Sequence, residues 1–364
     1  MRKQYLLYLL AAALITLLSS CKQTPVYKAL IITGQSDHDW KVSSEAVKQI
    51  LDETGMFSTV IATSPGKGED MSGFNPDFSG YDLVVLDYEG DTWPEKTTGS
   101  LIEYVENGGG VVLYNAKRDP GGASADSISV SERHDFEVRI TVSDHPVTKG
   151  LPVRWLHPYD EIIQGIKFAG EDVQVLAAAF SGNPFSGTGR RDPVLVARNR
   201  GQGRIFATLI GTPDGKENQA LHCAGFIVTL QRGAEWAATG SVTQEVPFDF
   251  PTAAGAVLWT DFKGMTPEEI FENIGNYDIG KSTKYFTLLQ SQIRKAAGDE
   301  KKLLKLEKNM VDVLGNDEAS DDAKKLILRE LSWMGTDYCI PAIKALASDP
   351  ELSDDVEFAL TRLQ

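Results

Sequence analysis

The chain has 364 residues, of which 42% are hydrophobic and 24% are charged, a composition typical of folded globular proteins rather than of disordered or fibrous ones. This length exceeds what one small hydrophobic core can organise, so we expect more than one domain. The net charge is −15 and no basic arm or basic–aromatic patch offsets it, which excludes nucleic acid as a partner.

Residues 1–20 have the pattern of an export signal rather than of a folded segment. Two basic residues precede an apolar run over 5–18 that is short for a permanent membrane helix. The sequence Leu-Ser-Ser-Cys at 18–21 then resembles the lipobox of bacterial lipoproteins. This resemblance implies lipidation of Cys21 and a periplasm-facing protein of the bacterial cell envelope, attached to the membrane by its lipid alone. An ordinary secretory signal is the alternative. Residues 21–27 are expected to be a tether.

Residues 28–246 alternate short apolar runs with amphipathic segments, the pattern of an α/β domain with a mostly parallel sheet. Strands are predicted at 29–33, 57–62, 83–87, 111–114, 173–180, 193–198 and 204–210, and helices at 43–54, 94–105 and 221–236. The glycine-containing turn at 199–203 predicts a hairpin between the last two strands. The stretch from 115 to 172 is less regular, with an alternating segment at 136–142.

Polar residues gather where three of the predicted strands end, at 35–40, at 88–93 and at Asn115. Ligands of open α/β sheets bind beyond the carboxyl ends of the strands, so these clusters predict a binding crevice. His38 and Glu89 are candidate catalytic residues there, because a carboxylate beside an imidazole makes it a better general base. The candidate substrate-binding residues at this edge are Asp39, Trp40, Asp91, Trp93 and Asn115. For Asp39, capping of the following helix is an alternative role.

A second concentration of polar and aromatic residues is the sequence WLHPYDE at 155–161. Its candidate catalytic residues are His157 and Glu161, and its candidate substrate-binding residues are Trp155 and Asp160. Carboxylates and imidazole can bond sugar hydroxyls, while aromatic rings contact the apolar face of a sugar. The same residues could instead form a buried hydrogen-bond network. Arg190 is a further candidate that could bind an acidic group or pair with carboxylates of the protein.

The sequence has no recognisable metal or cofactor motif, and we predict neither a metal nor a cofactor. No HxH, HExxH or CxxC spacing is present. Gly108–Gly110 precedes a predicted strand rather than a helix, which is the wrong order for a dinucleotide-binding loop. Cys223 falls in a predicted apolar helix and is expected in the core, and we do not expect it to pair with Cys339.

Seven blocks covering most of residues 28–245 occur together, in order. They are TGQSDHDW (33–40), DMSGFNPDFSGYDLVVLDYEGDTWP (70–94), YVENGGGVVLYNA (104–116), DHPVTKGLP (144–152), WLHPYDE (155–161), GRRDPVLVARNRGQGRIFATLIG (189–211) and LQRGAEWAATGSV (230–242). With these blocks the chain resembles the ThuA-like family, named for trehalose utilisation. The resemblance implies a flavodoxin-like, three-layer α/β sandwich similar to the class I glutamine amidotransferase domain. It also implies a carbohydrate ligand, a sugar or a keto-glycoside.

The resemblance does not extend to glutamine hydrolysis. Class I amidotransferases carry a nucleophilic cysteine on the turn after the corresponding strand, which here reads Asn115-Ala116-Lys117-Arg118. ThuA-like chains usually have histidine at that position and also after the glycine that ends the last strand, where this chain has Asn115 and Thr212. Two functions therefore stay open, an enzyme acting on a sugar and a non-catalytic module that binds a glycan or a protein.

Residues 247–281 are expected to be a linker, and the pattern of 282–364 indicates helices alone. The predicted helices are 282–297, 299–314, 320–334, 337–347 and 353–363. Similar Ser-Asp-Asp capping sequences at 320–322 and 353–355 recur 33 residues apart, which predicts a small all-α domain of HEAT-like helical pairs. A small unrelated bundle is the alternative. A stacked helical surface could dock another envelope protein.

Overall fold

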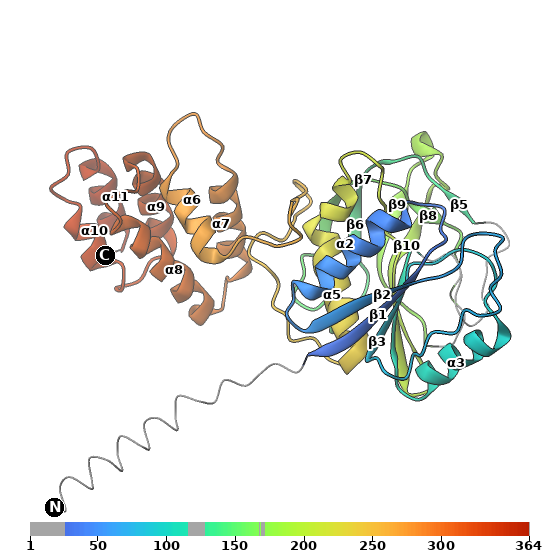
Figure 1. The fold of residues 1–364 in the computed structure, drawn as a ribbon. Coiled ribbons are helices and arrows are strands. Elements are labelled where there is room, and N and C mark those ends of the chain that lie inside the picture. Colours follow the sequence, from blue (N-terminus) through green and yellow to red (C-terminus); the bar gives the residue numbers. More distant parts are fainter. Residues whose placement is uncertain (1–25, 116–127, 167, 169–171, 364) are drawn as a thin grey trace, which may run out of the picture. The chain divides into compact units, whose positions relative to one another are not determined.

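The computed structural model describes residues 26–115, 128–166, 168 and 172–363 (Figure 1). They form two compact units, the first comprising the chain up to Glu245 together with Pro251–Phe262, and the second comprising Val246–Phe250 and the chain from Lys263 onward. The predicted lipidation site Cys21 lies outside the described residues. Among the helices of the described ranges, none combines the length and apolar character needed to cross a membrane.

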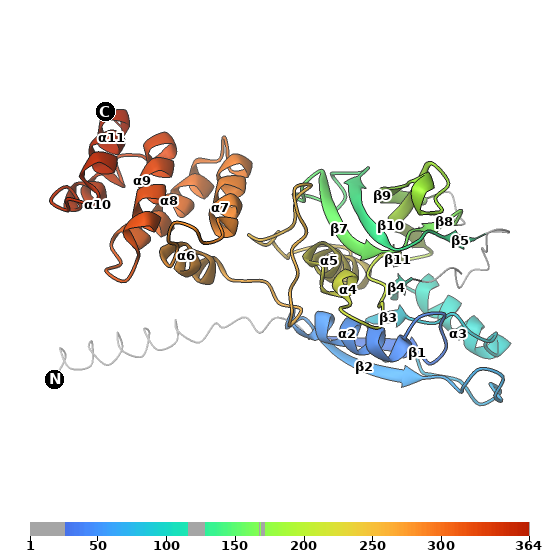
Figure 2. The same ribbon diagram turned by 90° about the horizontal axis from the view of Figure 1, so that it is seen from above.

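The first unit is built on a nine-stranded sheet with helices packed against it (Figure 2). Its strands are β1 (Tyr27–Thr33), β2 (Phe57–Thr63), β3 (Leu83–Leu86), β4 (Gly110–Tyr114), β6 (His134–Ile140), β7 (Arg154–Asp160), β9 (Gln174–Ser181), β10 (Arg190–Arg200) and β11 (Gly203–Thr208). The strand order is β2-β1-β3-β4-β11-β10-β9-β6-β7. The strands from β2 to β11 in this order are parallel, and the others pair antiparallel. A separate two-stranded ladder joins β5 (Ser129–Val130) to β8 (Ile163–Gln164).

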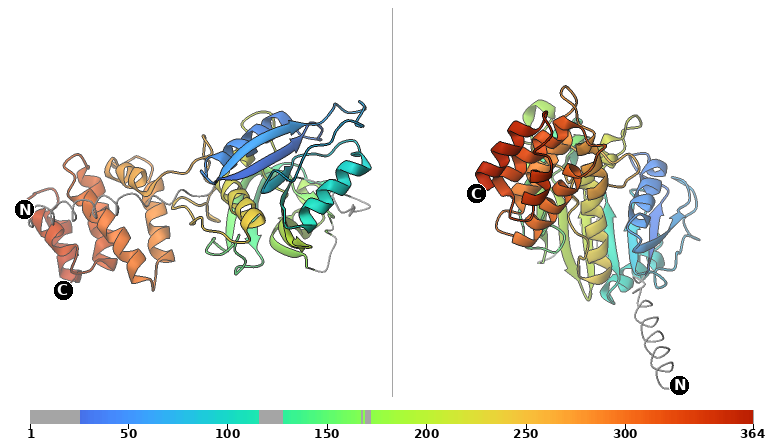
Figure 3. Two further views of the ribbon diagram at one scale, coloured as in Figure 1. Left: turned by 60° about the horizontal axis from the view of Figure 1, so that its bottom comes forward. Right: turned by 90° about the vertical axis from the view of Figure 1, so that its left-hand side faces the viewer.

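Helices cover both faces of the parallel strands. The helices of this unit are α2 (Trp40–Asp52), α3 (Glu95–Glu106), α4 (Gln219–His222) and α5 (Ala224–Thr239), with a short 3-10 turn at Asn183–Phe185. On one face Leu101 and Val105 of α3 pack with Leu30 and Ile32 of β1. Helices α2 and α5 lie side by side (Figure 3), where Gln231 Nε2 bonds a backbone oxygen of α2. The expected α/β sheet with surrounding helices is confirmed.

Most predicted elements of this unit are present within a few residues of their expected bounds. The predicted hairpin is confirmed, because β10 and β11 pair antiparallel around Gly201, whose φ is 57°. Helix α2 begins three residues earlier than predicted, because the Asp39 carboxylate accepts hydrogen bonds from the backbone N–H groups of Lys41 and Val42. Strand β7, which pairs with β6, was not predicted from the sequence.

Part of the expected linker packs onto the first unit. The backbone oxygen of Thr252 accepts a 2.9 Å hydrogen bond from the N–H of Leu156 in β7, and that of Val257 accepts one of 2.9 Å from Ala224. The N–H of Trp259 donates to the backbone oxygen of His222 at 2.8 Å. These bonds fix residues 251–262 beside α4 and the start of α5.

The second unit consists of helices around its own apolar core. Its helices are α6 (Pro267–Gly275), α7 (Lys284–Lys295), α8 (Glu300–Leu314), α9 (Asp321–Met334), α10 (Ile340–Ala345) and α11 (Ser353–Leu363). Helix α6 lies in the stretch expected to be a linker and begins with a capping box formed by Thr266 and Glu269. The predicted cap at Ser320 is present, since its hydroxyl accepts from the N–H of Ala323. The HEAT-like character of this unit stays a prediction.

Replacing Gly225 of α5 by alanine is expected to destabilise the first unit by about 1–3 kcal/mol. A Cβ at this position would lie 2.3 Å from Nε1 of Trp155, which is fully buried, so the ring or the helix would have to shift. Urea-induced unfolding measures the loss. Gly99→Ala is the matched control, because Gly99 is exposed on α3 and no atom would lie within 4 Å of the added carbon. That variant should gain about 0.5–1 kcal/mol, and equal stability of the two variants would contradict the prediction.

Candidate functional site

A pocket with a volume of about 320 Å³ lies at the carboxyl ends of β1, β3, β4 and β11. These four strands are consecutive neighbours in the sheet, so loops distant in the sequence meet there. The lining residues are Asp37, His38, Asp39, Glu89, Asn115, Arg133, Glu161, Ile163, Thr212, Pro213, Asp214 and Gly215. The pocket therefore collects groups from the strand ends where polar clusters were predicted.

A buried carboxylate holds His38 in one orientation. Nε2 of His38 lies 2.8 Å from Oδ1 of Asp87, a fully buried side chain that follows β3. Oδ2 of Asp87 accepts a 2.7 Å hydrogen bond from the Ser43 hydroxyl on α2. The Tyr114 ring packs edge-on against the imidazole at 5.8 Å between ring centroids. Because a carboxylate only accepts hydrogen bonds, Nε2 carries the proton and Nδ1 is the basic nitrogen.

The basic nitrogen of His38 bonds a serine hydroxyl. Nδ1 lies 2.9 Å from Oγ of Ser36, and with this tautomer the serine hydroxyl donates the hydrogen bond. The His38 side chain is 10% exposed and lines the pocket. Nδ1 can accept a proton passed through the Ser36 hydroxyl, while Asp87 stabilises the imidazolium that forms.

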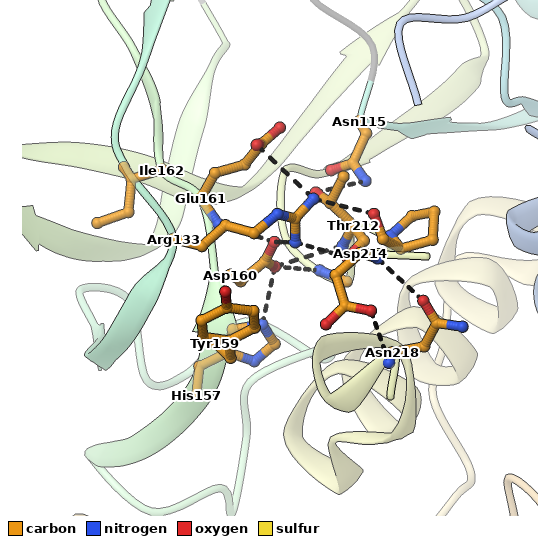
Figure 4. A network of polar contacts seen from close by, with 12 residues as sticks. Asn115, Arg133, His157, Tyr159, Asp160, Glu161, Ile162, Thr212, Asp214 and Asn218 are labelled. Atoms are coloured by element: carbon orange, nitrogen blue, oxygen red, sulfur yellow. Dashed lines mark hydrogen bonds and ion pairs between the residues drawn. The ribbon is translucent and has the colours of Figure 1, made fainter. Parts of the chain in front are cut away.

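One wall of the pocket is organised by Arg133 (Figure 4). Its guanidinium donates to the backbone oxygens of Thr212 at 3.1 Å and of Pro213 at 2.9 Å. It also forms an ion pair of 3.7 Å with Glu161. These contacts fix the loop after β11 and hold the Glu161 carboxylate at the pocket.

The loop after β11 is further fixed by Asp214. Its carboxylate accepts hydrogen bonds from the N–H groups of Lys216 at 2.8 Å and Asn218 at 2.9 Å. Burial acts to raise the pKa of Asp214, but these two backbone bonds and the charge of Arg133 outweigh it and lower the pKa. Asp214 therefore contributes a full negative charge to the pocket at neutral pH.

Asp160 is a buried anchor behind this wall rather than part of its surface. The side chain is fully buried, and its Oδ2 accepts hydrogen bonds from the N–H of Gly211 at 2.7 Å and from Nε2 of His157 at 2.9 Å. Its Oδ1 accepts from the N–H of Glu161 at 2.9 Å and lies 3.6 Å from the Arg133 guanidinium. One carboxylate thus connects the end of β7 to the loop that follows β11 (Figure 4).

His157 is fully buried and carries a raised pKa. Burial alone would lower its pKa, because it disfavours the charged ring, but interactions with Cys223 and with the Asp160 carboxylate outweigh burial and raise the pKa to about 9. The imidazolium is therefore part of the folded structure at neutral pH, while an unfolded chain would lose this proton near pH 6.5.

The stability of the first unit is expected to fall as pH rises from about 6.5 to about 9. Because the folded-state pKa of His157 is raised, its contribution is complete below the unfolded-state value and is lost as pH passes through the folded-state value. The contribution of His157 to the free energy of unfolding is roughly 3 kcal/mol, obtained by converting the difference between its folded-state and unfolded-state pKa into free energy. Urea unfolding across this pH range measures it. His157→Gln keeps a donor for Asp160 and should remove this pH dependence; an unchanged profile would contradict the assignment.

Five residues predicted for the site line the pocket, and the structure places the others elsewhere. Those in the pocket are His38, Asp39, Glu89, Asn115 and Glu161. Asp39 also caps α2, which is the alternative role predicted for it.

The remaining predicted site residues do not line this pocket. Trp155, His157 and Asp160 are fully buried, which corresponds to the buried-network alternative for WLHPYDE. Asp91 accepts a hydrogen bond from the N–H of Gly68, and Trp93 packs on Phe74, Phe78 and Tyr88. Trp40 opens α2 under the Lys41 ammonium, and Arg190 is exposed at the start of β10.

Four residues that shape the site were not singled out from the sequence, namely Asp87, Ser43, Arg133 and Asp214. Asp87 is the last residue of the strand predicted at 83–87 and directly follows the observed β3, so its position at a strand end was the available signal. Arg133 and Asp214 lie in irregular segments, where no local pattern marks them.

The structure also tests the sequence for a metal-binding cluster and for the position of the cysteines. Within the described residues, no three or more His, Cys, Asp or Glu side chains are grouped in a way that could hold a metal ion. Cys223 is fully buried at the start of α5, so the prediction that it lies in the core is confirmed. Cys223 and Cys339 are both free thiols.

Comparison with known proteins identifies relatives of the first unit. The ThuA family model, described as trehalose utilisation, matches residues 28–237. The crystal structure of a ThuA-like protein from Parabacteroides merdae ATCC 43184 has 39% sequence identity and a TM-score of 0.61, over 66% of this chain and 100% of that one. That of a ThuA-like protein from Bacteroides uniformis ATCC 8492 has 17% identity and a TM-score of 0.42, over 62% of this chain and 96% of that one. No curated protein matches the chain. The helices from α6 onward lie outside the family match.

Proposed function

The chain belongs to the ThuA family of trehalose utilisation, and from this premise we propose that its first unit is an enzyme acting on a sugar or a keto-glycoside. One observation carries the proposal. His38, oriented by the buried Asp87, lies in the same pocket as two glutamates, Glu89 and Glu161. A base with a fixed tautomer in one pocket with carboxylic groups is an arrangement suited to general acid–base catalysis.

In this proposal Nδ1 of His38 accepts a proton from the ligand. In a sugar the proton comes from a hydroxyl group. In a keto-glycoside it comes from the carbon next to the carbonyl group, where the carbonyl makes the C–H more acidic than the other C–H groups of the ring. Asp87 stabilises the imidazolium formed at His38. Glu89 and Glu161 supply the second acid–base group, and Asn115 and Thr212 bond ligand hydroxyls from the end of the sheet.

A screen of the purified protein against disaccharides and their keto derivatives tests this function. We expect turnover of at least one of them, and loss of turnover in His38→Gln and in Glu161→Gln with unchanged urea unfolding. Glu45→Gln is a matched control for charge, because Glu45 is exposed on α2 outside the pocket. Turnover that survives in both site variants would contradict the assignment.

We also propose that the protein works at the cell envelope, anchored by lipid on Cys21. The sequence Leu-Ser-Ser-Cys at 18–21 after an apolar run supports this location. Metabolic labelling with a radioactive fatty acid should label the intact chain and fail to label Cys21→Ser. Equal labelling of both would exclude Cys21 as the lipid site.

A second candidate function, docking of an envelope protein by the helical unit, is favoured by one surface. Trp333 of α9 is 69% exposed, and the Arg362 guanidinium of α11 stacks on its ring at 3.6 Å. Exposed tryptophan and arginine are common at the centres of protein interfaces. An envelope protein retained by the intact chain should be lost with Trp333→Ala and kept with Leu304→Ala, an exposed apolar control on α8. Retention by both variants would count against docking there.

A further inference from the structure

The pocket around His38 is rich in negative charge. Its lining includes the carboxylates of Asp37, Asp39, Glu89, Glu161 and Asp214, and among the described residues that line it none is a lysine. The net charge of the whole chain, −15, adds to this field rather than offsetting it. A ligand that carries a phosphate or carboxylate group would meet like charge on several sides.

The guanidinium of Arg133 does not offer an anion site in compensation. It is already bonded to two backbone oxygens, those of Thr212 and Pro213. It is also paired with Asp160 at 3.6 Å and with Glu161 at 3.7 Å. An anion that approached Nη1 and Nη2 would compete with these backbone bonds and with the two carboxylates that hold the pocket wall.

The helix terminus beside the pocket is occupied as well. The first N–H groups of a helix commonly bind phosphate, since they point outward and carry partial positive charge. At α2 these donors bond the Asp39 carboxylate, with distances of 3.2 Å from Lys41 and 3.3 Å from Val42. A negative side chain of the protein thus takes the place that an anionic ligand would use.

Asn115 gives an independent indication of what the ligand supplies. Its side chain lines the pocket, yet the residue is only 3% exposed and its backbone has φ of 47°, a strained conformation for a residue other than glycine. Nδ2 donates to the Thr212 hydroxyl at 3.2 Å, but Oδ1 has no hydrogen-bond partner among the residues the structure describes. A buried acceptor without a partner costs about 1–3 kcal/mol, which a donor on the ligand would recover.

From these observations we propose that the pocket selects a sugar that carries a protonated amino group. The inference rests on the proposed function, in that it takes the ligand of this pocket to be a sugar. An ammonium group brings a positive charge and three donors, whereas a hydroxyl brings one donor and a phosphate dianion brings none. It therefore complements both the carboxylates and the amide oxygen of Asn115.

Calorimetric titration with three matched probes tests the selection: glucosamine at slightly acid pH, where its amine is protonated, glucose, and glucose 6-phosphate. Glucosamine is expected to bind about tenfold more tightly than glucose, the effect of two or three partly screened ion pairs. Glucose 6-phosphate should not bind measurably. High salt should reduce the preference for glucosamine, because screening weakens these ion pairs.

Two variants locate the selection in the pocket. Glu89→Gln should reduce the ratio of glucosamine to glucose affinity by about threefold, the contribution of one such pair, while Glu45→Gln on the exposed face of α2 should leave it unchanged. Equal affinities for glucosamine and glucose would overturn the inference and leave the sugar site standing. Tighter binding of glucose 6-phosphate would overturn it too. Failure of all three probes to bind would overturn it as well, whereas the proposed function stands or falls by the turnover screen.

Discussion

Replacing Asp160 by alanine is expected to lower the free energy of unfolding of the first unit by about 3–5 kcal/mol. The carboxylate is fully buried and compensates the charge of the buried His157, whose pKa is raised to about 9. Its removal leaves that imidazole without its 2.9 Å bond and the N–H of Gly211 without an acceptor. Both losses occur away from water, so each costs more than the mean value of a hydrogen bond.

Urea-induced unfolding of the full-length protein measures the effect of Asp160→Ala. Asp135→Ala is the matched control, because the exposed Asp135 accepts a single 2.9 Å hydrogen bond from the N–H of Tyr159. The control should lose about 1 kcal/mol or less. Adding His157→Gln to Asp160→Ala should cost less than the sum of the single losses, because the buried charge is then gone. Equal losses in Asp160→Ala and the control would contradict the anchoring role.

The parallel part of the sheet could be predicted because its strands are continuous apolar runs. Buried on both faces, β1, β3 and β4 have no solvent side that would call for polar residues. Strand β7 escaped prediction because its seven residues include Arg154, His157, Pro158 and Asp160. The polar side chains of His157 and Asp160 are buried only because they bond each other and because Asp160 also bonds a distant loop. These hydrogen bonds depend on the tertiary structure, and no local sequence pattern predicts them.

Helix α6 was not predicted for a different reason. The capping box of Thr266 and Glu269 was present in the sequence, but the helix is nine residues long and follows a stretch rich in proline and glycine. A short helix is stabilised mainly by its packing, and Ile270, Phe271 and Ile274 of α6 are buried in the core of the second unit. The contacts that decide its formation therefore lie outside the segment itself.

The candidate site could be predicted as far as its residues follow strand ends. His38, Glu89 and Asn115 lie in the pocket for that reason. Arg133 and Asp214 are brought there by loops whose course depends on tertiary hydrogen bonds, so no spacing in the sequence marks them. The sequence WLHPYDE was predicted to form either a ligand site or a buried hydrogen-bond network. Glu161 lines the pocket, whereas His157 and Asp160 form a buried network.

The residue most informative about catalysis is Asp87. On the substrate identified by the screen, Asp87→Asn is expected to lower kcat/KM by about 10²–10⁴-fold, which is the range of rate enhancement that general-base catalysis provides. The Ser43 hydroxyl donates to Oδ2 at 2.7 Å and would keep the amide oxygen of the variant on its own side. The amide nitrogen would then face Nε2 of His38, where a carboxylate oxygen lies at 2.8 Å in the native protein.

With a donor facing it, Nε2 must become the acceptor, and the ring proton moves to Nδ1, so His38 can no longer take a proton from the side of Ser36. The variant should therefore lose kcat while binding the same ligand with little change in affinity, because the pocket lining is untouched. Ser43→Ala, which leaves the carboxylate in place, should cost about tenfold or less, as expected for one supporting hydrogen bond. Urea unfolding of both variants separates this effect from loss of structure. Native turnover in Asp87→Asn, with turnover abolished in His38→Gln, would show that Asp87 has no part in setting the tautomer and serves the packing of the strand end alone.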